Sequence, residues 1–271
     1  MISDDGRSVS GLSLTDASPV SHLRPARENE IPAGSSRPSI AVVVPHGGDC
    51  PHRYLAWGWV RAQFAKHHPG WDVVMGTTDV EGFSRTQAIR DALGRTDADT
   101  IIVSDADVWC DGLNEAVSHV AEYGWAIPHE LLHRLSPEST RQVLDGADWH
   151  GLPLSTDNRQ DSKPYRGHET GTLCVFRRDV LDQVPPDPRF VGWGSEDDAW
   201  ALALRALVGK PWRGTADLVH LWHPAEPRMN RVVGNERSQT LLARYKSARR
   251  SPESMRALLD EVTDAESLQT R

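Results

Sequence analysis

Two aspartates separated by one residue, Asp105 and Asp107, follow a short apolar run at residues 100–103. Side chains alternate between the two faces of an extended segment, so both carboxylates are expected to point the same way across Ala106. Two converging carboxylates repel each other and require a cation, and oxygen ligands at a strand end suit Mg²⁺ or Mn²⁺. Either ion in turn favours a phosphate-bearing ligand. In isolation, however, the same Asp-x-Asp pattern is more typical of a solvated turn after a strand.

A second segment rich in chemistry is Phe-Val-Gly-Trp-Gly-Ser-Glu-Asp-Asp-Ala-Trp at residues 190–200. Ser195 stands where it can cap a helix, and the acidic residues after it complement the positive end of the helix dipole. That structural explanation does not account for the glycines on either side of Trp193. Together with the aspartate pair, we interpret the segment as a carboxylate base beneath a tryptophan that stacks on a sugar.

Two histidines, His220 and His223, end the last expected strand beside Pro224. A single histidine at a strand end is usually an ordinary surface or core residue. Two of them, three residues apart, can bring an imidazole to a divalent ion that carboxylates already hold, and mixed ligation of this kind favours Mn²⁺ over Mg²⁺.

The segment Gly-Phe-Ser-Arg-Thr at residues 82–86 opens a predicted helix. Arg85 lies beside the free backbone amides of a helix start, which makes it a candidate contact for a diphosphate or nucleotide. Without the other motifs, an exposed arginine at a helix start explains this residue equally well.

The first half of the expected ordered region alternates strands with helices. Residues 40–44 form a near-continuous apolar run typical of a strand covered on both faces, and a helix at 54–68 carries its apolar residues at helical spacing (Leu55, Trp59, Val60 and Phe64). A strand at 71–75, a helix at 84–93 and a strand at 100–103 follow. This order is typical of a parallel sheet with helices on its faces, in which ligands bind beyond the carboxyl ends of the strands. His46, residues 77–81 and the two aspartates all fall at such ends.

The second half continues with further strands, helices and one long polar loop. The expected elements are a helix at 113–123, a helical or irregular stretch at 128–148, a loop at 149–168, a strand at 172–176, helices at 178–183 and 196–207, a strand at 216–221, and helices at 236–249 and 252–268. Residues 1–38 lack any periodic pattern and are expected to be a disordered arm. We expect one catalytic domain at 39–235 and a helical extension at 236–271.

Composition limits the classes of protein to which the chain can belong. A formal net charge of −8 over 271 residues argues against broad nucleic-acid binding, which needs a basic surface. Three cysteines (Cys50, Cys110 and Cys174) show no metal-type spacing, so reduced thiols in a cytoplasmic protein are expected. No apolar run approaches the length of a membrane span, and the N-terminus lacks the apolar core of a signal peptide.

In this order, the motifs resemble those of glycosyltransferases of the GT-A fold, over about residues 39–224. The Gly-Trp-Gly-Ser-Glu-Asp-Asp block is especially similar to that of β-galactosyltransferases and polypeptide N-acetylgalactosaminyltransferases. The resemblance implies a Rossmann-like α/β fold in which helices flank a mixed, mostly parallel sheet. It also implies transfer of a sugar from a nucleotide-sugar donor, with UDP favoured, to a hydroxyl of an acceptor such as a glycan, a protein, a lipid-linked sugar or a modified base.

The resemblance assigns roles on the donor side. Asp107 would bind Mn²⁺ or Mg²⁺, and Asp105 would touch the ribose, or the metal through water. His223 and His220 match the metal-binding pair of galactosyltransferases, although other GT-A enzymes have a single histidine, which leaves open which of the two binds. The residues that would hold the nucleotide are Pro45, Thr77, Asp79, Phe83, Arg85 and Asp105.

It also assigns roles on the acceptor side. Trp193, between Gly192 and Gly194, would stack on a donor or acceptor sugar. Glu196 and Asp197 match a Glu-Asp pair in which the aspartate is the base of inverting members. A lid over the diphosphate is a further hypothesis: Arg228, Arg231 and Lys246 follow the histidines in a segment that could fold over it, with Arg228 and Arg231 as its phosphate contacts. The chain departs from the family pattern at Ser84, which replaces Asn, at Ser195, which replaces Gly, and after Pro45, where an arginine is often found.

Two other functions compete with this interpretation. A nucleotidyltransferase acting on a sugar phosphate also uses metal-bound carboxylates, but it needs a basic glycine-rich loop after the first strand, and no lysine or arginine follows Gly47-Gly48 until Arg53. A catalytically inactive sugar-binding relic would have lost its acids, whereas this sequence retains them.

Overall fold

The computed structural model describes residues 38–47, 50–80, 83–157, 162–192, 194–224 and 236–269, with side chains described as far as Val262 in the last stretch. Of the expected N-terminal arm, only Pro38 lies within these residues.

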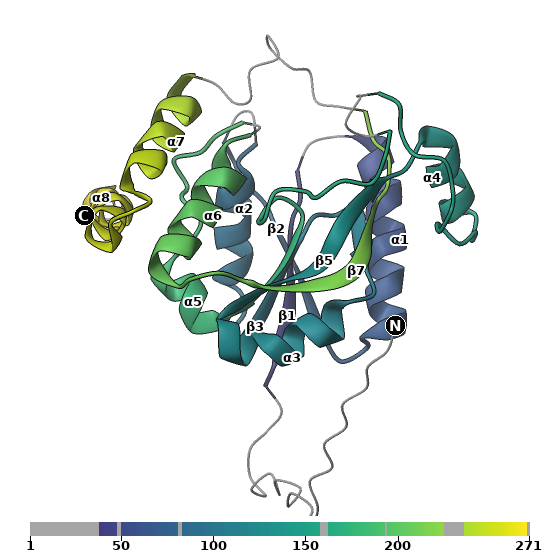
Figure 1. Ribbon diagram of the computed structural model, residues 1–271, viewed down its shortest axis with the longest axis horizontal. Helices are drawn as coiled ribbons and strands as arrows, with labels where there is room; N and C mark the ends of the chain where they lie inside the picture. Colours follow the sequence, from purple (N-terminus) through teal and green to yellow (C-terminus); the bar gives the residue numbers. More distant parts are fainter. Residues whose placement is uncertain are drawn as a thin grey trace, which may run out of the picture. The chain divides into compact units, whose positions relative to one another are not determined.

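Within the described part of the chain, seven strands form one sheet in the order β2-β1-β3-β6-β5-β7-β4 (Figure 1). The strands are β1 (Ile40–Pro45), β2 (Asp72–Gly76), β3 (Thr100–Ser104), β4 (Val108–Cys110), β5 (Trp125–Arg134), β6 (Leu173–Arg177) and β7 (Trp212–His220). The helices are α1 (Pro51–His67), α2 (Arg85–Leu93), α3 (Leu113–Tyr123), α4 (Pro137–Leu144), α5 (Arg178–Gln183), α6 (Glu196–Leu207), α7 (Glu236–Ala248) and α8 (Pro252–Gln269).

The sheet is mixed. β1 runs parallel to β2 and β3, and β5 runs parallel to β7, whereas β6 is antiparallel to both β3 and β5, and β4 is antiparallel to β7. The mixed α/β sheet flanked by helices is therefore confirmed. Parallel pairs do not predominate as expected, because the described sheet has as many antiparallel neighbours as parallel ones.

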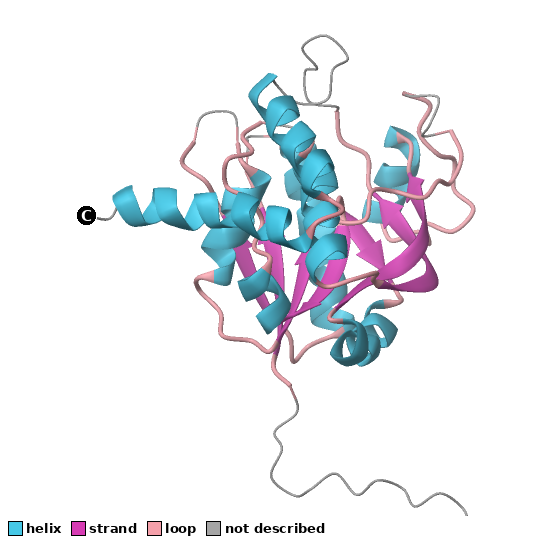
Figure 2. Ribbon diagram, turned by 60° about the vertical axis from the view of Figure 1, so that its left-hand side comes forward, coloured by secondary structure: helices cyan, strands magenta, loops and turns pink. Residues whose placement is uncertain are grey.

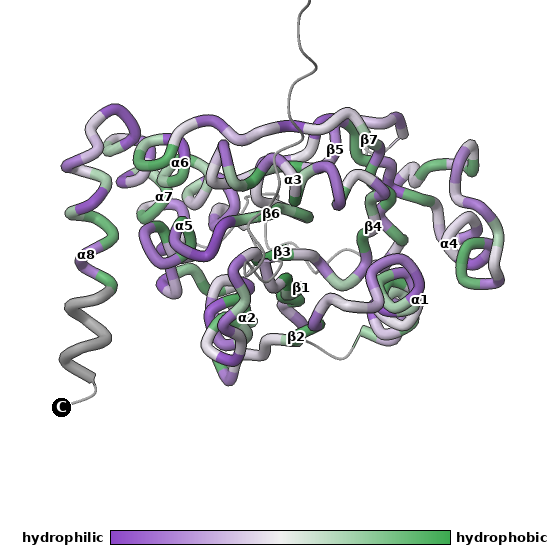
Figure 3. The backbone as a smooth tube through the Cα atoms, turned by 90° about the horizontal axis from the view of Figure 1, so that it is seen from below, coloured by the Kyte–Doolittle hydropathy of each residue, from purple (hydrophilic) through white to green (hydrophobic). Residues whose placement is uncertain are grey.

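Two apolar cores lie on opposite faces of the sheet. Ala41 and Val43 belong to one core and Val42 and Val44 to the other, and all four side chains are fully buried, as the apolar run predicted. Residues of α2, α5, α6, α7 and α8 close the first core, and residues of α1, α3 and α4 close the second. Figure 2 shows helices on both sides of the strands, and Figure 3 shows the hydrophobic segments of β1, β3 and β6 between α2 and α1.

Most of the expected elements are confirmed with small shifts at their ends, and those at 113–123, 178–183 and 196–207 are confirmed without any shift. The expected helical or irregular stretch at 128–148 is wrong, because it contains most of β5 followed by α4. Pro128 and several polar residues hide this strand, and its pairing with β7 shifts register on both sides of His129. On α1 the expected apolar face is wrong at Leu55, which is 61% exposed, whereas Trp57 packs inward.

The edge strand β4 was not expected, and it determines where the aspartates lie. β3 and β4 lie at distant positions in the strand order, yet only residues 105–107 join them. Four steps along the chain span about 14 Å at most. The sheet must therefore curl until β4 approaches the carboxyl end of β3, and the two aspartates lie in the connection across this gap.

The two C-terminal helices pack against α6 and complete the first core. Their fully or nearly fully buried residues include Tyr245, Met255 and Leu258. The hydroxyl of Tyr245 donates to the buried carboxylate of Asp187 over 2.8 Å, and Arg189 binds the same carboxylate. None of the helices in the described part of the chain combines the length and apolar character needed to cross a membrane.

Candidate functional site

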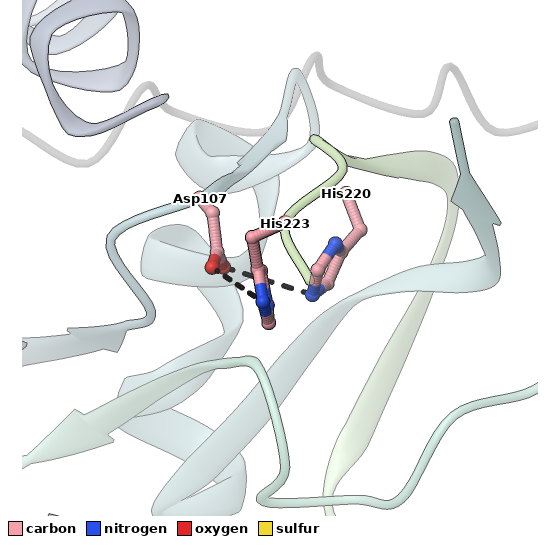
Figure 4. Close-up of side chains that lie close together, drawn as sticks. All are labelled: Asp107, His220 and His223. Atoms are coloured by element: carbon pink, nitrogen blue, oxygen red, sulfur yellow. Dashed lines mark ion pairs between the residues drawn. The ribbon is translucent and has the colours of Figure 1, made fainter. Parts of the chain in front are cut away.

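Asp107, His220 and His223 converge at one end of the sheet (Figure 4). The Nε2 atom of His223 lies 3.3 Å from one Asp107 carboxylate oxygen, and the Nε2 atom of His220 lies 3.7 Å from the other. One ligand atom from each residue lies within 4.8 Å of the others. One carboxylate and two imidazoles at this spacing are a suitable set of ligands for a divalent transition-metal ion.

The pairing of β4 with β7 brings these residues together. Val108 lies opposite His220 in the antiparallel register, and the backbone N–H of Leu221 donates to the carbonyl of Asp107 over 2.9 Å. His223 follows three residues after the strand end, in the expected turn before Pro224. The sequence left open which histidine would bind a metal, and the structure brings both of them close to Asp107.

Backbone carbonyls fix the orientation of both imidazole rings. The Nδ1 atom of His220 lies 2.8 Å from the carbonyl oxygen of Leu221, and that of His223 lies 2.8 Å from the carbonyl oxygen of Pro224. A carbonyl only accepts, so each Nδ1 carries a proton, and Nε2 is the ring nitrogen that each histidine turns toward Asp107. Burial lowers the pKa of His220 to about 3, which keeps this ring neutral.

Asp107 is ionised despite its burial. Burial raises its pKa, but the charged neighbours Arg53 and Arg134 act in the opposite direction, and the pKa lies below its usual range. The Nε atom of Arg53, from the first turn of α1, lies 3.9 Å from a carboxylate oxygen of Asp107. Sequence reasoning did not select Arg53 for the site, although its position in the helix after the β1 loop was a usable signal.

Asp105 has a different partner from Asp107. The connection is a turn rather than the extended segment that was expected, and Asp105 accepts a hydrogen bond from the Nε of Arg85 over 2.9 Å. Burial, joined by repulsion from Asp107, raises the pKa of Asp105 to about 6 against the effect of Arg85. The two carboxylates therefore repel each other as expected, but among the described residues only Asp107 belongs to the carboxylate–imidazole group.

Four polar atoms near these residues are buried and unsatisfied. The two terminal nitrogens of Arg85, one carboxylate oxygen of Glu196 and Nε2 of His46 have no hydrogen-bond partner among the described residues. Arg85 also interacts electrostatically with Glu196 and Asp197, which connects the α2 start to the α6 start. Buried polar groups left without partners are costly, and a cluster of them is typical of a site that a ligand completes.

The start of α2 is tied to the segment that precedes α6. Ser84 caps α2 by accepting from the backbone N–H of Gln87, and its hydroxyl donates to the carbonyl of Phe190 over 2.6 Å. The backbone N–H of Gly192 donates to the carbonyl of Phe83 over 2.9 Å. The segments expected on the donor side and on the acceptor side are thus physically joined.

The start of α6 carries the expected acids, but its cap differs from the expectation. Ser195 occupies the cap position with a left-handed backbone (φ 76°), and its side chain makes no capping hydrogen bond. Burial and repulsion from Asp197 raise the pKa of Glu196 to about 7. Asp197 lies against Gly171, and Thr170 donates to its backbone carbonyl over 2.7 Å.

His168 is a neighbour of these acids that sequence reasoning missed. Its Nδ1 lies 2.9 Å from a carboxylate oxygen of Asp198 and 3.8 Å from one of Asp197. The hydrogen bond to Asp198 raises the pKa of His168 to about 9, so the ring is charged at neutral pH. His168 lies at the end of the long polar loop, where no local pattern distinguished it.

The remaining expected site residues are less closely involved. Pro45 is buried at the end of β1, whereas Thr77 and Asp79 are exposed after β2, and the Thr77 backbone N–H donates to Asp91. Phe83 places its ring against Gly47, where an added Cβ would lie 2.3 Å from the ring. Gly192 and Gly194 both have left-handed backbones, as their residue type allows. Trp193, Arg228 and Arg231 lie outside the described residues.

No protein-family profile and no curated protein matches the chain. Among solved structures it is similar to a Drosophila β-1,4-galactosyltransferase 7 variant in complex with manganese, UDP-Gal and xylobiose (16% identity, TM-score 0.45, covering 71% of this chain and 77% of that chain). It is also similar to glucosyl-3-phosphoglycerate synthase from Mycobacterium tuberculosis in complex with Mn²⁺, UDP-glucose and phosphoglyceric acid (15% identity, TM-score 0.42, covering 78% and 79%). A third similar structure is a mannosyltransferase from Pyrobaculum calidifontis in complex with GDP-Man and Mn²⁺ (14% identity, TM-score 0.40, covering 85% and 76%). Similarity at this level does not assign a function, which rests on the geometry of the site.

Proposed function

We propose that the chain is a metal-dependent glycosyltransferase of the GT-A type that moves a sugar from a nucleotide-sugar donor, with UDP-sugars favoured, to an acceptor hydroxyl. One observation carries this proposal. The Asp107–His220–His223 cluster is joined through Asp105 to Arg85, a buried arginine whose terminal nitrogens lack partners among the described residues. A cation site beside an unsatisfied arginine suits a diphosphate.

Asp107, His220 and His223 would hold Mn²⁺ or Mg²⁺, with Mn²⁺ favoured by the two imidazoles. Bound there, the ion would neutralise charge on the departing diphosphate. The residues fit this role because backbone carbonyls hold both Nδ1 atoms, so that both Nε2 atoms face the carboxylate of Asp107. Asp105 holds Arg85 in place.

Arg85 would bind the diphosphate directly. Its Nε is occupied by Asp105, which leaves the planar pair of terminal nitrogens to donate to phosphate oxygens. As the bond between the anomeric carbon and the diphosphate oxygen breaks, its electron pair leaves with the nucleoside diphosphate. Fixed donors aimed at that developing charge lower the barrier.

Asp197 would act as the base on the opposite side of the sugar. It would take the proton of the acceptor hydroxyl while the acceptor oxygen forms its bond to the anomeric carbon, which inverts the configuration. Glu196 would position the acceptor, with Gly192, Trp193 and Gly194 forming the sugar-stacking loop. Arg228 and Arg231 would close over the phosphates.

Thermal-shift measurements with UDP, GDP and CTP, each with and without Mn²⁺, test this function. Metal-dependent stabilisation by a nucleoside diphosphate supports the transferase. Stabilisation by CTP alone overturns it in favour of a nucleotidyltransferase acting on a sugar phosphate. Proton NMR of the first product then tests the mechanism, because a retained anomeric configuration contradicts the role of Asp197 as the base.

A further inference from the structure

A hollow of about 510 Å³ lies between the start of β7 and the adjacent faces of α6 and α7, which lie side by side in Figures 1 and 3. Five basic side chains line it, together with two carboxylates, Glu169 and Asp198. The basic residues are Arg166, Arg205, Arg213, Lys246 and Arg249. In a chain with a net charge of −8, so local an excess of positive charge is unusual.

The two carboxylates do not neutralise the hollow. The Glu169 carboxylate forms ion pairs with two arginines. One of its oxygens lies 2.6 Å from Nε of Arg205, and the other lies 3.7 Å from a terminal nitrogen of Arg213. Asp198 is occupied by His168. Among the described residues, no carboxylate lies within ion-pair distance of Arg166, Lys246 or Arg249.

Crowding of like charges is also visible at Arg213. Its pKa is lowered by burial and then by the positive charge of Arg166, with Arg205 contributing in the same direction. Arginines held this close together repel each other, and a bound anion removes that repulsion while accepting several charge-assisted hydrogen bonds.

The hollow begins beside the proposed catalytic base. His168 and Asp198 line it, and His168 lies 3.8 Å from a carboxylate oxygen of Asp197. A molecule whose anionic group occupies the hollow can therefore extend a hydroxyl toward Asp197.

We propose that the hollow binds a phosphate monoester carried by the acceptor, so that the acceptor substrate is a phosphorylated hydroxyl compound. This inference rests on the proposed glycosyltransferase function. It assigns the arginines a role in choosing the acceptor that is separate from the donor contacts of Arg85 and the metal-binding group. A neutral acceptor would leave the guanidinium groups unsatisfied and would bind more weakly.

Calorimetric titration of the full chain with glycerol 3-phosphate, and with glycerol as the uncharged match, tests the proposal at constant ionic strength and without metal. Glycerol 3-phosphate should bind saturably and glycerol should not. Arg249→Gln should weaken binding about threefold, and Arg166→Gln combined with Arg249→Gln about tenfold. Arg250→Gln is the matched control, because Arg250 is the exposed neighbour of Arg249 and does not line the hollow.

Absence of saturable binding, or an equal loss in the Arg250→Gln and Arg249→Gln variants, overturns the proposal. Binding of UDP with Mn²⁺ to the same variants separates its failure from that of the proposed function. If UDP–Mn²⁺ binds while glycerol 3-phosphate does not, only the acceptor assignment fails. If glycerol 3-phosphate binds while UDP–Mn²⁺ does not, the glycosyltransferase function fails, and the role of the hollow in acceptor binding fails with it.

Discussion

Arg85 donates its Nε–H to Asp105 over 2.9 Å, whereas its two terminal nitrogens are buried without a hydrogen-bond partner among the described residues. A buried donor left unsatisfied costs about 1–3 kcal/mol, and more when it is charged. Asp105 therefore fixes the direction of the guanidinium but does not satisfy it. An anion that bound the free edge would recover that cost, which makes Arg85 a sensitive position for testing the proposed nucleotide site.

Arg85→Lys should weaken UDP binding in the presence of Mn²⁺ by about tenfold or more, because a lysine keeps the charge but cannot donate from a planar pair of nitrogens. Calorimetry measures the change. Arg61→Lys, at an exposed position of α1, is the control and should bind UDP like the wild type. Unchanged affinity in the Arg85 variant would exclude a diphosphate contact.

Asp107→Asn and His223→Ala should each reduce Mn²⁺ affinity by more than about 100-fold, since loss of even an outer partner of a metal ligand costs about 10–100-fold. The readout is Mn²⁺ titration followed by electron paramagnetic resonance. His150→Ala, an exposed histidine outside the group, serves as the control. Near-ultraviolet circular dichroism in EDTA shows whether each variant retains its fold, and wild-type affinity in a folded Asp107→Asn protein would contradict the metal site.

Glu196 should make the metal-free protein less stable as the pH rises. Its pKa is raised from the ordinary 4.5 to about 7, so the folded state binds more protons than the unfolded state between these values. The stabilisation of the fold that comes from the protonated Glu196 carboxyl is fully present below about pH 4.5 and is lost as the pH rises through 7. Glu196→Gln cannot ionise, so relative to the wild type it should gain about 2 kcal/mol between pH 5 and pH 8, after allowance for the partial hydration of the carboxyl. Urea denaturation at both pH values measures the difference, and parallel behaviour of the two proteins would contradict the raised pKa.

Ser195→Gly should be more stable than Ser195→Ala by about 1 kcal/mol. Both variants lose the hydroxyl, but only alanine keeps a Cβ on a backbone with φ 76°, where glycine is favoured. The comparison thus isolates backbone strain from any hydrogen bond of the side chain. Urea denaturation at one pH is sufficient, and equal stabilities would show that the left-handed conformation costs little here.

The sequence predicted most of the helices and the covered strands, because their apolar periodicity and capping residues act locally. Leu113, Arg178 and Glu196 each begin a helix where the sequence predicted one. The failures share a physical cause. β4 is three residues long, and Pro128 interrupts β5, so neither strand has a local pattern, and both depend on pairing with β7.

The candidate site was predicted as a set of residues but not as an arrangement. Asp107, His220 and His223 come together as the resemblance implied. Asp105 instead binds Arg85, because a turn at residues 105–107 replaces the expected extended segment. Arg53 and His168 approach the site through tertiary packing alone, and no spacing along the chain indicates such contacts.

The register of β4 against β7 also has a consequence for how the protein would acquire the proposed metal ion. Asp107 and His220 lie far apart in the sequence, and they meet only when the last strand has docked. A nascent chain that has not yet added β7 holds a lone carboxylate in place of a chelating group. Metal binding should therefore occur only after β7 has joined the sheet. The bound ion would then stabilise the complete fold relative to intermediates that lack β7.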